Sequence, residues 1–242
     1  YNPKGHYYFA IDLTVSNADR NLLEQVNEVV MHGRGIITPI KGAYNLSARG
    51  KKRVRIALDF LSRYPIVTGD LARDRIYLLQ EALEYLETHK GSSEQIAKNK
   101  AMERIRRKLR RIKESGTSSR RHQQRCTDRN SIGYFLAGIL DGEGSFGFKK
   151  SGARYQPYFM VAMKDRKIIE AFKTFIEYGN IRKRKDGAYH YEVNDRNELQ
   201  RICKLFLNRF PLRHRRQRER LAKIQRILND YTRNSDITSE MI

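Results

Sequence analysis

The chain has 242 residues, of which 39% are hydrophobic, so it can bury a core as one domain or as two of roughly 100 residues. Lysine and arginine number 49 against 27 aspartates and glutamates, and the net charge of +22 indicates a polyanionic partner, above all nucleic acid. No segment has the roughly 18 consecutive apolar residues of a membrane-spanning helix, so we expect no membrane partner; docking on anionic lipid is a weak alternative.

The first predicted unit covers residues 1–87. Alternating apolar and polar residues over 8–15 predict a strand, and Asp19 is placed to cap the amphipathic helix that follows it. Two short strands joined by a turn at Gly42 come next, and two helices separated at Pro65 complete the unit. Because the sequence starts at Tyr1 and not at methionine, we expect that an N-terminal piece is missing.

Residues 88–130 form a predicted basic helical linker. Its stretch KNKAMERIRRKLRRIKESG has apolar residues at helical spacing, among them Met102, Ile105 and Leu109, with lysine and arginine on the remaining faces. One interpretation is a solvated connector helix. The other is a basic helix that lies along a phosphate backbone, and the one-sided charge favours it.

The second predicted unit covers residues 131–232, with a tail at 233–242, and it repeats the first. The pattern DLTVSNADRNLLEQVNEVVM (12–31) matches YFMVAMKDRKIIEAFKTFIE (158–177), and FLSRYP (60–65) matches FLNRFP (206–211). An internal repeat indicates two copies of one supersecondary unit. The second copy has in addition a helix and a strand at its start, which the first copy lacks.

This additional helix is read from YFLAGILDGEGSF, residues 134–146. Ala137 and Gly138 would form a helix interface, because small residues let another helix approach closely. The helix ends with Asp141 and Glu143, although the C-terminal end of a helix dipole disfavours negative charge. If two such helices pack about a two-fold axis, their acids meet, and a divalent cation such as Mg²⁺ removes the repulsion by binding carboxylate and carbonyl oxygens.

The segment LAGILDGEG (136–144) resembles the motif of the LAGLIDADG homing endonucleases, and the repeat around it extends the resemblance. The resemblance implies an α+β fold of two αββαββα units related by pseudo-two-fold symmetry. Each unit would have a saddle-shaped antiparallel sheet, the first unit being truncated at its N-terminus. A complete chain of this kind would be a monomeric pseudo-dimer.

The resemblance also implies a function, a site-specific endonuclease that cleaves double-stranded DNA by divalent-metal phosphodiester hydrolysis. Glu143, with the carbonyl of Gly142, would hold Mg²⁺ or another divalent cation. Arg215 would stabilise charge in the transition state, and Asn17 would order water. The alternative is a non-catalytic descendant of the family that binds nucleic acid, such as an intron maturase, an RNA-bound structural protein or a transcription regulator. Its ligand could be intron RNA or another structured RNA.

Solvent-facing side chains of the strands would contact DNA bases and phosphates. The candidates of the second unit are Lys149, Arg154, Tyr155, Gln156, Arg182, Arg184, Lys185, Tyr189, Tyr191 and Arg213. Those of the first unit are Lys4, His6, Lys41, Tyr44, Asn45 and Arg49.

The chain departs from the family pattern in three respects, and the departures at Met163, Gly69 and Arg215 favour the alternative. The first unit lacks its acidic helix, so Glu143 has no visible partner. A lysine that family members often carry before the last helix is replaced by Gly69 in one unit and by Arg215 in the other. The second unit has Met163 where the first has Asn17, and methionine cannot hold a water molecule for attack.

The chain has two cysteines, Cys126 and Cys203, which lie far apart and do not form a CxxC pair. This indicates neither a zinc site nor a disulfide framework, and it is typical of a reducing intracellular compartment, such as a bacterial cytoplasm or an organelle matrix.

Overall fold

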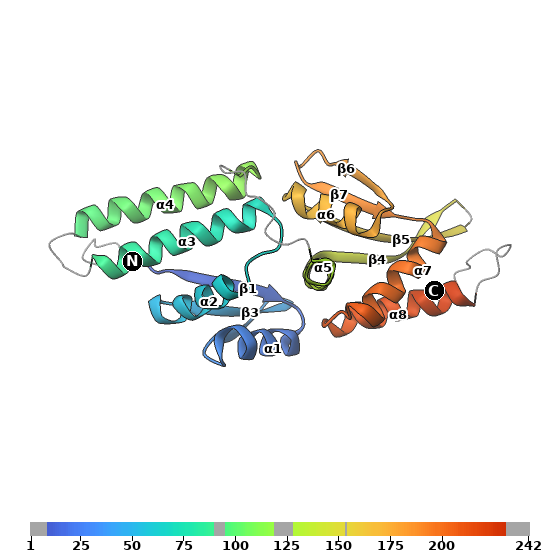
Figure 1. Cartoon of the computed structure of the whole chain (residues 1–242), viewed down its shortest axis with the longest axis horizontal. Helices are drawn as coiled ribbons and strands as arrows, with labels where there is room; N and C mark the ends of the chain where they lie inside the picture. Colours follow the sequence, from blue (N-terminus) through green and yellow to red (C-terminus); the bar gives the residue numbers. More distant parts are fainter. Residues whose placement is uncertain (1–8, 90–94, 119–127, 153, 231–242) are drawn as a thin grey trace. The chain divides into compact units, whose positions relative to one another are not determined.

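The computed structural model describes residues 9–89, 95–118, 128–152 and 154–230 (Figure 1). In both copies of the repeat, the sequence patterns correspond to helices and strands of this structure. Lys4, His6 and Cys126 therefore lie outside the described residues. The chain divides into two compact units, one of Tyr1–Ile66 with Asp70–Gln123 and the other of Val67–Gly69 with Gln124–Ile242.

The first unit contains a three-stranded antiparallel sheet in the order β1-β3-β2. Asp19 caps the first helix, since its Oδ1 accepts the backbone N–H of Leu22 at 3.2 Å. The elements are β1 (Asp12–Asn17), α1 (Arg20–Met31), β2 (Ile36–Ile40), β3 (Ala43–Arg49), α2 (Lys51–Arg63), α3 (Asp70–Thr88) and α4 (Gln95–Ser115). The basic helix of the predicted linker is α4, and its apolar side chains Met102, Ile105 and Ile112 are buried in the core cluster of this unit.

The second unit contains a four-stranded antiparallel sheet in the order β4-β5-β7-β6. Its elements are α5 (Arg129–Glu143), β4 (Gly144–Ser151), β5 (Arg154–Met163), α6 (Arg166–Ile176), β6 (Asn180–Lys183), β7 (Tyr189–Val193), α7 (Arg196–Lys204), a π-helical turn η2 (Leu205–Arg209) and α8 (Arg215–Asn229). The predicted α+β class with two antiparallel sheets is confirmed, as are the additional helix and strand of the second unit.

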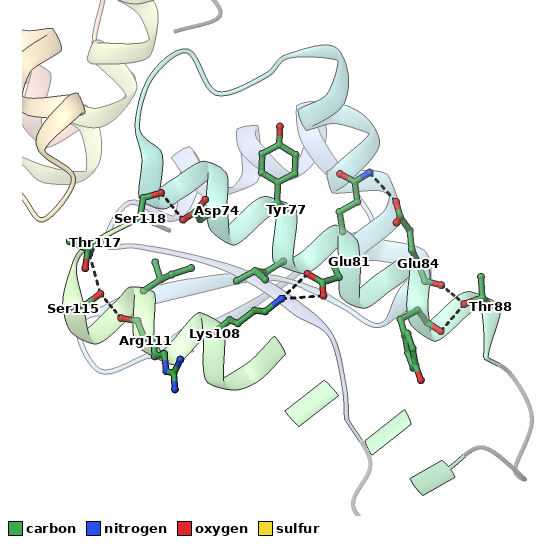
Figure 2. A pocket seen from close by; sticks show the side chains of 14 residues that line it. Asp74, Tyr77, Glu81, Glu84, Thr88, Lys108, Arg111, Ser115, Thr117 and Ser118 are labelled. Carbon is green, nitrogen blue, oxygen red and sulfur yellow. Dashed lines mark hydrogen bonds and ion pairs between the residues drawn. The ribbon is translucent and has the colours of Figure 1, made fainter. Parts of the chain in front are cut away.

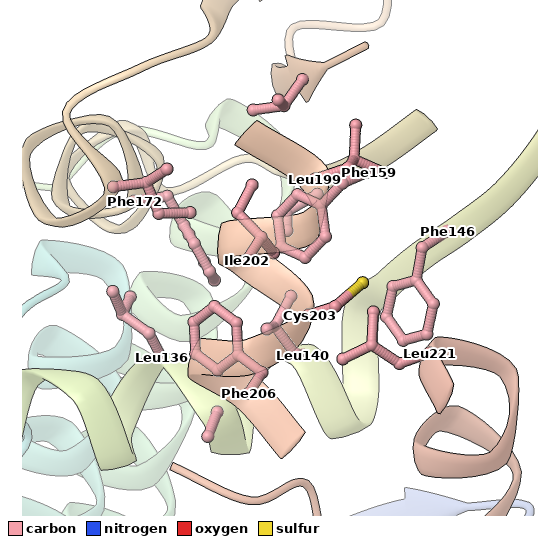
Figure 3. Packing of buried hydrophobic residues seen from close by; sticks show 14 of the residues in the cluster. Leu136, Leu140, Phe146, Phe159, Phe172, Leu199, Ile202, Cys203, Phe206 and Leu221 are labelled. Atoms are coloured by element: carbon pink, nitrogen blue, oxygen red, sulfur yellow. The ribbon is translucent and has the colours of Figure 1, made fainter. Parts of the chain in front are cut away.

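The core of the second unit fixes the position of α5 (Figure 3). Leu136 and Leu140 are fully buried on the helix face that meets the sheet. They belong to one cluster with an aromatic group around Phe159, whose ring stacks on Phe146 at 6.0 Å between centroids. Cys203 is buried in the same cluster, and burial raises the pKa of its thiol to about 12, so it is an unreactive core side chain.

Each sheet has one face toward its core and one opposite face, because side chains alternate along a strand. In the second sheet the core face carries Phe146, which is paired with Phe159, and Tyr191, which is paired with Val161. We call the opposite face the open face.

Among the residues that the structure describes, no helix combines the length and apolar character needed to cross a bilayer.

Candidate nucleic-acid interface and metal site

The end of α5 carries the two acids of the motif in different environments. Asp141 is buried at 6% exposure, and both of its carboxylate oxygens accept the backbone N–H of Arg213, at 3.1 and 2.9 Å. Its Oδ1 also accepts the N–H of His214 at 3.0 Å. Burial raises the pKa of Asp141, and these two N–H donors oppose the rise. Asp141 is thus committed to the turn that begins α8.

Glu143 is the last residue of α5 and is exposed. Within the described ranges its carboxylate takes part in no hydrogen bond or ion pair, in contrast to Asp141. Gly142, which precedes it, is exposed as well. A carboxylate and a carbonyl group at a helix C-terminus therefore remain available to a ligand from outside the unit.

These donors suit a hard divalent cation by kind, because Mg²⁺ prefers carboxylate and carbonyl oxygens. By number they provide only part of a coordination sphere. No group of three or more acidic, histidine or cysteine side chains that could hold a metal occurs in the described part of the chain. Glu143 fits one half of a two-acid site, and phosphate oxygens, water or a second acid would have to complete it.

The two small residues of α5, Gly138 and Ala137, lie in different environments. Gly138 is exposed, and a Cβ atom added to it would meet nothing within 4 Å. Ala137 is 4% exposed and belongs to the core cluster of its own unit. The expectation that Ala137 lines a helix interface is therefore wrong for this residue.

Asp141 also determines where the basic residues at the start of α8 lie. The backbone of Arg213 is held by the Asp141 carboxylate, while its side chain is exposed. Arg215 is the first residue of α8, and its Nε donates to Glu219 at 2.8 Å on the surface of the helix. In addition, Gln217 Nε2 donates to the carbonyl of Gly144 at 2.7 Å, so α8 is attached to the chain just beyond Glu143.

The open face of the second sheet brings together basic side chains from separate strands. Lys149 on β4 is paired in register with Gln156 on β5, and Arg182 on β6 is paired with His190 on β7. Arg154 lies on the same side at the start of β5. Arg184 and Lys185 follow β6 in the exposed turn before β7, where Arg184 forms an ion pair with Asp186 at 3.1 Å.

Three predicted contact residues of this sheet point away from the open face. Tyr191 is fully buried, and its hydroxyl donates to the carbonyl of Tyr178 at 2.7 Å, so the prediction of a nucleic-acid contact is wrong for Tyr191. Tyr189 lies on the same side and packs partly against the core. Tyr155 shares that side at the outer end of β5, opposite Lys150. The three tyrosines were included because a single strand does not show which of its two faces is turned away from the core.

The open face of the first sheet is polar but carries few charges. Ser16 Oγ donates to Asn45 Oδ1 at 2.6 Å, and the hydroxyl groups of Thr14 and Ser47 lie 3.1 Å apart. Arg49, also on this face, forms an ion pair with Asp12 at 3.6 Å. Lys41 is exposed in the turn between β2 and β3.

Tyr44 occupies the same place in the first unit as Tyr189 in the second. The guanidinium of Arg20 lies over the Tyr44 ring at 5.9 Å, and that of Arg166 lies over the Tyr189 ring at 5.7 Å. Tyr44 therefore packs under an arginine on the core side of its sheet. The repeated contact supports the internal repeat that the sequence predicts.

The residues at the departures from the family pattern have structural roles of their own. Asn17 ends β1, and its Oδ1 accepts the N–H of Asp19 at 2.8 Å, which closes a turn into α1. Met163, at the end of β5, packs partly against the core. Gly69 has a φ of +111°, a conformation in which a lysine would be strained.

Sequence reasoning missed the polar residues that share the open faces with the predicted basic ones. In the second unit these are Tyr158, His190 and Glu192, and in the first unit Thr14, Ser16, Thr38 and Ser47. Alternation along each strand was the available signal, but it requires a register that a single strand does not define.

A cavity of about 890 Å³ lies between α3 and α4 in the first unit (Figure 2). Its walls pair opposite charges, since Lys108 Nζ lies 3.4 Å from both carboxylate oxygens of Glu81. Ser118 Oγ donates to Asp74 Oδ2 at 2.7 Å at one end. The predicted site residues do not line this cavity, and its compensated charge does not suit a polyanion.

Comparison with known proteins indicates which family of proteins the chain resembles. Residues 136–225 match the family model described as LAGLIDADG endonuclease. This part of the chain therefore matches the LAGLIDADG family, which confirms the resemblance predicted from LAGILDGEG. No curated protein matches the chain.

Solved structures extend the similarity to both units. The LAGLIDADG homing endonuclease I-GzeII in complex with its DNA target is 17% identical, with a TM-score of 0.75 over 96% of this chain and 84% of that one. The LAGLIDADG meganuclease I-AabMI bound to uncleaved DNA is 17% identical, with a TM-score of 0.69 over 96% and 85%. I-SmaMI bound to an uncleaved DNA target in the presence of calcium ions is 20% identical, with a TM-score of 0.67 over 91% and 79%. The chain has the fold of these homing endonucleases.

Proposed function

We propose that the chain is a DNA-binding endonuclease of the LAGLIDADG type, which binds duplex DNA on the open faces of its two sheets. The net charge of +22 supports a polyanionic ligand. The neighbouring structures with DNA support duplex DNA as that ligand. Lys149, Arg154, Gln156 and Arg182 contact DNA from the second sheet, and Arg49 and Lys41 from the first.

The observation that carries the catalytic part of the proposal is the contrast between the two acids of α5. Asp141 is used by the fold, whereas Glu143 is exposed without a partner among the described residues. Glu143 and the Gly142 carbonyl would hold a divalent cation, Mg²⁺ by preference, and such a cation stabilises charge on a phosphodiester. The calcium ions present with I-SmaMI support this kind of cofactor.

The remaining residues assist by position. Arg215 and Arg213 lie at the start of α8, which Asp141 attaches to the end of α5. Arginine binds phosphate oxygens and stays protonated, so both residues serve as phosphate contacts and not as bases. Asn17 can order water only through the lone pair or the amide group that its bond to Asp19 leaves free.

The basic outer side of α4 is a further phosphate contact in this proposal. Lys100, Arg104, Arg107 and Arg111 recur at helical spacing and are all exposed, on a side that the buried residues Met102 and Ile105 do not share. A row of four cations along one helix suits a nucleic-acid backbone.

A non-catalytic nucleic-acid-binding protein, with DNA or structured RNA as its ligand, is the second candidate. Three residues favour it, because none of them offers a base or a water ligand. They are Met163, which packs against the core, Gly69 with its positive φ, and Arg215, which is paired with Glu219. Selection from a pool of randomised duplexes, with and without Mg²⁺, tests both. We expect enriched sequences and strand scission that requires Mg²⁺. Enrichment without scission supports the second candidate. If neither enrichment nor scission is observed, the DNA-binding proposal is overturned.

A further inference from the structure

Glu192 is a buried carboxylate on the open face of the second sheet. It lies on β7 between the core residues Tyr191 and Val193, so its side chain points to the face opposite the core. Only 7% of the side chain is exposed. A carboxylate in this place is unexpected, since the same face is otherwise suited to a polyanion.

Two basic side chains from two other strands meet at this carboxylate. Lys149 Nζ, on β4, donates to Oε1 at 2.5 Å, and the Arg182 guanidinium, on β6, donates to Oε2. Each oxygen of Glu192 thus holds one cation, and the three charges sum to +1. Lys149 and Arg182 are themselves 42% and 67% exposed, so their remaining N–H groups face solvent in fixed positions.

A polar atom without a partner lies beside this cluster. His190 is two residues before Glu192 on the same strand face, in register with Arg182. Its Nε2 atom is buried and has no hydrogen-bond partner in the part of the chain that the structure describes. Burial lowers the pKa of His190, so its imidazole is neutral near pH 7 and can donate or accept one bond at that atom according to its tautomer. Because the Nε2 atom is buried, it is not itself accessible to a base edge.

We infer that Glu192 is a positioning residue for sequence recognition, an inference that depends on the proposed function. By binding Lys149 and Arg182 at once, it restrains both cations and withdraws part of their charge from phosphates. Restrained donors discriminate among base edges in the major groove, while mobile cations bind any phosphate with similar affinity. The cluster of Lys149, Arg182 and Glu192 is a base-reading element, and Glu192 gives it its selectivity.

The test compares Glu192→Gln with wild type and with Glu170→Gln, all as the full chain. Glu170 forms an exposed pair with Arg166 on α6, so this control makes the same change in charge elsewhere in the unit. Dissociation constants are measured for a duplex selected by wild type and for a scrambled duplex, over a range of salt concentrations. Far-UV circular dichroism of each variant reports folding.

We expect Glu192→Gln to bind the scrambled duplex more tightly and to prefer the selected duplex less, by about tenfold, near the lower end of one bidentate base contact. The slope of log K against log salt should become steeper by about 1 to 2, because up to two cations are released to phosphates at about 0.9 each. Glu170→Gln should leave the preference unchanged. A purely structural role would weaken binding to both duplexes equally and would overturn the inference.

Lys149→Gln and Arg182→Gln keep the test decisive if Glu192→Gln fails to fold. Each variant should reduce the preference at particular base pairs of the selected site, and an unchanged preference in both overturns the inference. Failure of the proposed function is a separate result. If wild type selects no sequence from the pool, the proposal of DNA recognition is wrong. If wild type prefers its selected duplex and Glu192→Gln keeps the same preference, only the role of Glu192 is rejected.

Discussion

The carboxylate of Asp141 accepts the backbone N–H of Arg213, a residue 72 positions later in the sequence. This bond and the one from His214 attach the start of α8 to the end of α5. Asp141→Ala would leave both donors in a buried place without an acceptor, at about 1–3 kcal/mol for each unpaired group. We expect a loss of about 2–4 kcal/mol in the free energy of unfolding, measured by urea denaturation with circular dichroism.

Asp195→Ala is the matched control for this effect. Asp195 is an exposed N-cap of α7 that accepts a single bond, from the N–H of Glu198 at 3.0 Å. Loss of such a cap costs about 0.5–2 kcal/mol. Equal losses in the two variants would mean that Asp141 acts as an ordinary cap and does not join the two helices.

Glu143→Gln should separate binding from cleavage. Because Glu143 has no partner among the described residues, its substitution should leave folding and DNA affinity close to wild type. Scission in Mg²⁺ should fall by at least about 100-fold, since an amide is a much weaker metal ligand than a carboxylate. The measurement is the nicking rate on the selected duplex, with Glu170→Gln as a control for charge. An unchanged rate would remove Glu143 from the active site.

Lys100, Arg104 and Arg111 of α4 should contribute to affinity without contributing to sequence choice. Replacement of all three by alanine should reduce the salt slope of binding by about 2 to 3, since each lost phosphate contact accounts for about 0.9. The preference for the selected duplex should not change. The matched control is the triple alanine variant at Arg106, Arg110 and Lys113, in which Arg106 and Arg110 pair with Glu103 and Glu114. Equal slopes in both triple variants would mean that the outer side of α4 makes no specific contact.

The order of elements was predictable because helix and strand periods, caps and the internal repeat are local signals. Asp19 caps α1 as the sequence indicates, and LAGILDGEG places Glu143 at a helix end. The partners of each strand face were not predictable in this way. Tyr191 and Glu192 are adjacent, and one is a core residue while the other faces the opposite side. Only the pairing of β7 with β5 and β6 decides which is which, and that pairing joins residues far apart in the chain.

A second non-local contact explains why the residue types alone do not distinguish Asp141 from Glu143, so that the family resemblance was needed to assign the metal to Glu143. Both are acids near a helix C-terminus, with one residue between them. Their difference arises from the turn before α8, whose N–H groups reach Asp141 and not Glu143.

Glu192 should also give the stability of the chain a defined dependence on pH. Burial acts to raise the pKa of this carboxyl. The hydrogen bonds from Lys149 and Asn194 and the charges of Lys149 and Arg182 outweigh burial and hold the pKa below its ordinary value of 4.5. A group with a lowered native pKa binds fewer protons in the folded than in the unfolded state. Its contribution to stability is therefore present above pH 4.5 and is lost as the pH falls through the native pKa.

The measurement is the difference in thermal midpoint between wild type and Glu192→Gln from pH 7 to pH 2.5. Wild type should be more stable at neutral pH, because the amide of the variant offers Lys149 and Arg182 one neutral acceptor oxygen in place of two charged ones. The difference should shrink below pH 4.5, as protonation makes Glu192 resemble glutamine. Asp141, whose raised pKa has the opposite effect, is present in both proteins and cancels in the comparison. A difference that stays constant down to pH 2.5 would mean that shape, and not charge, is what Glu192 contributes.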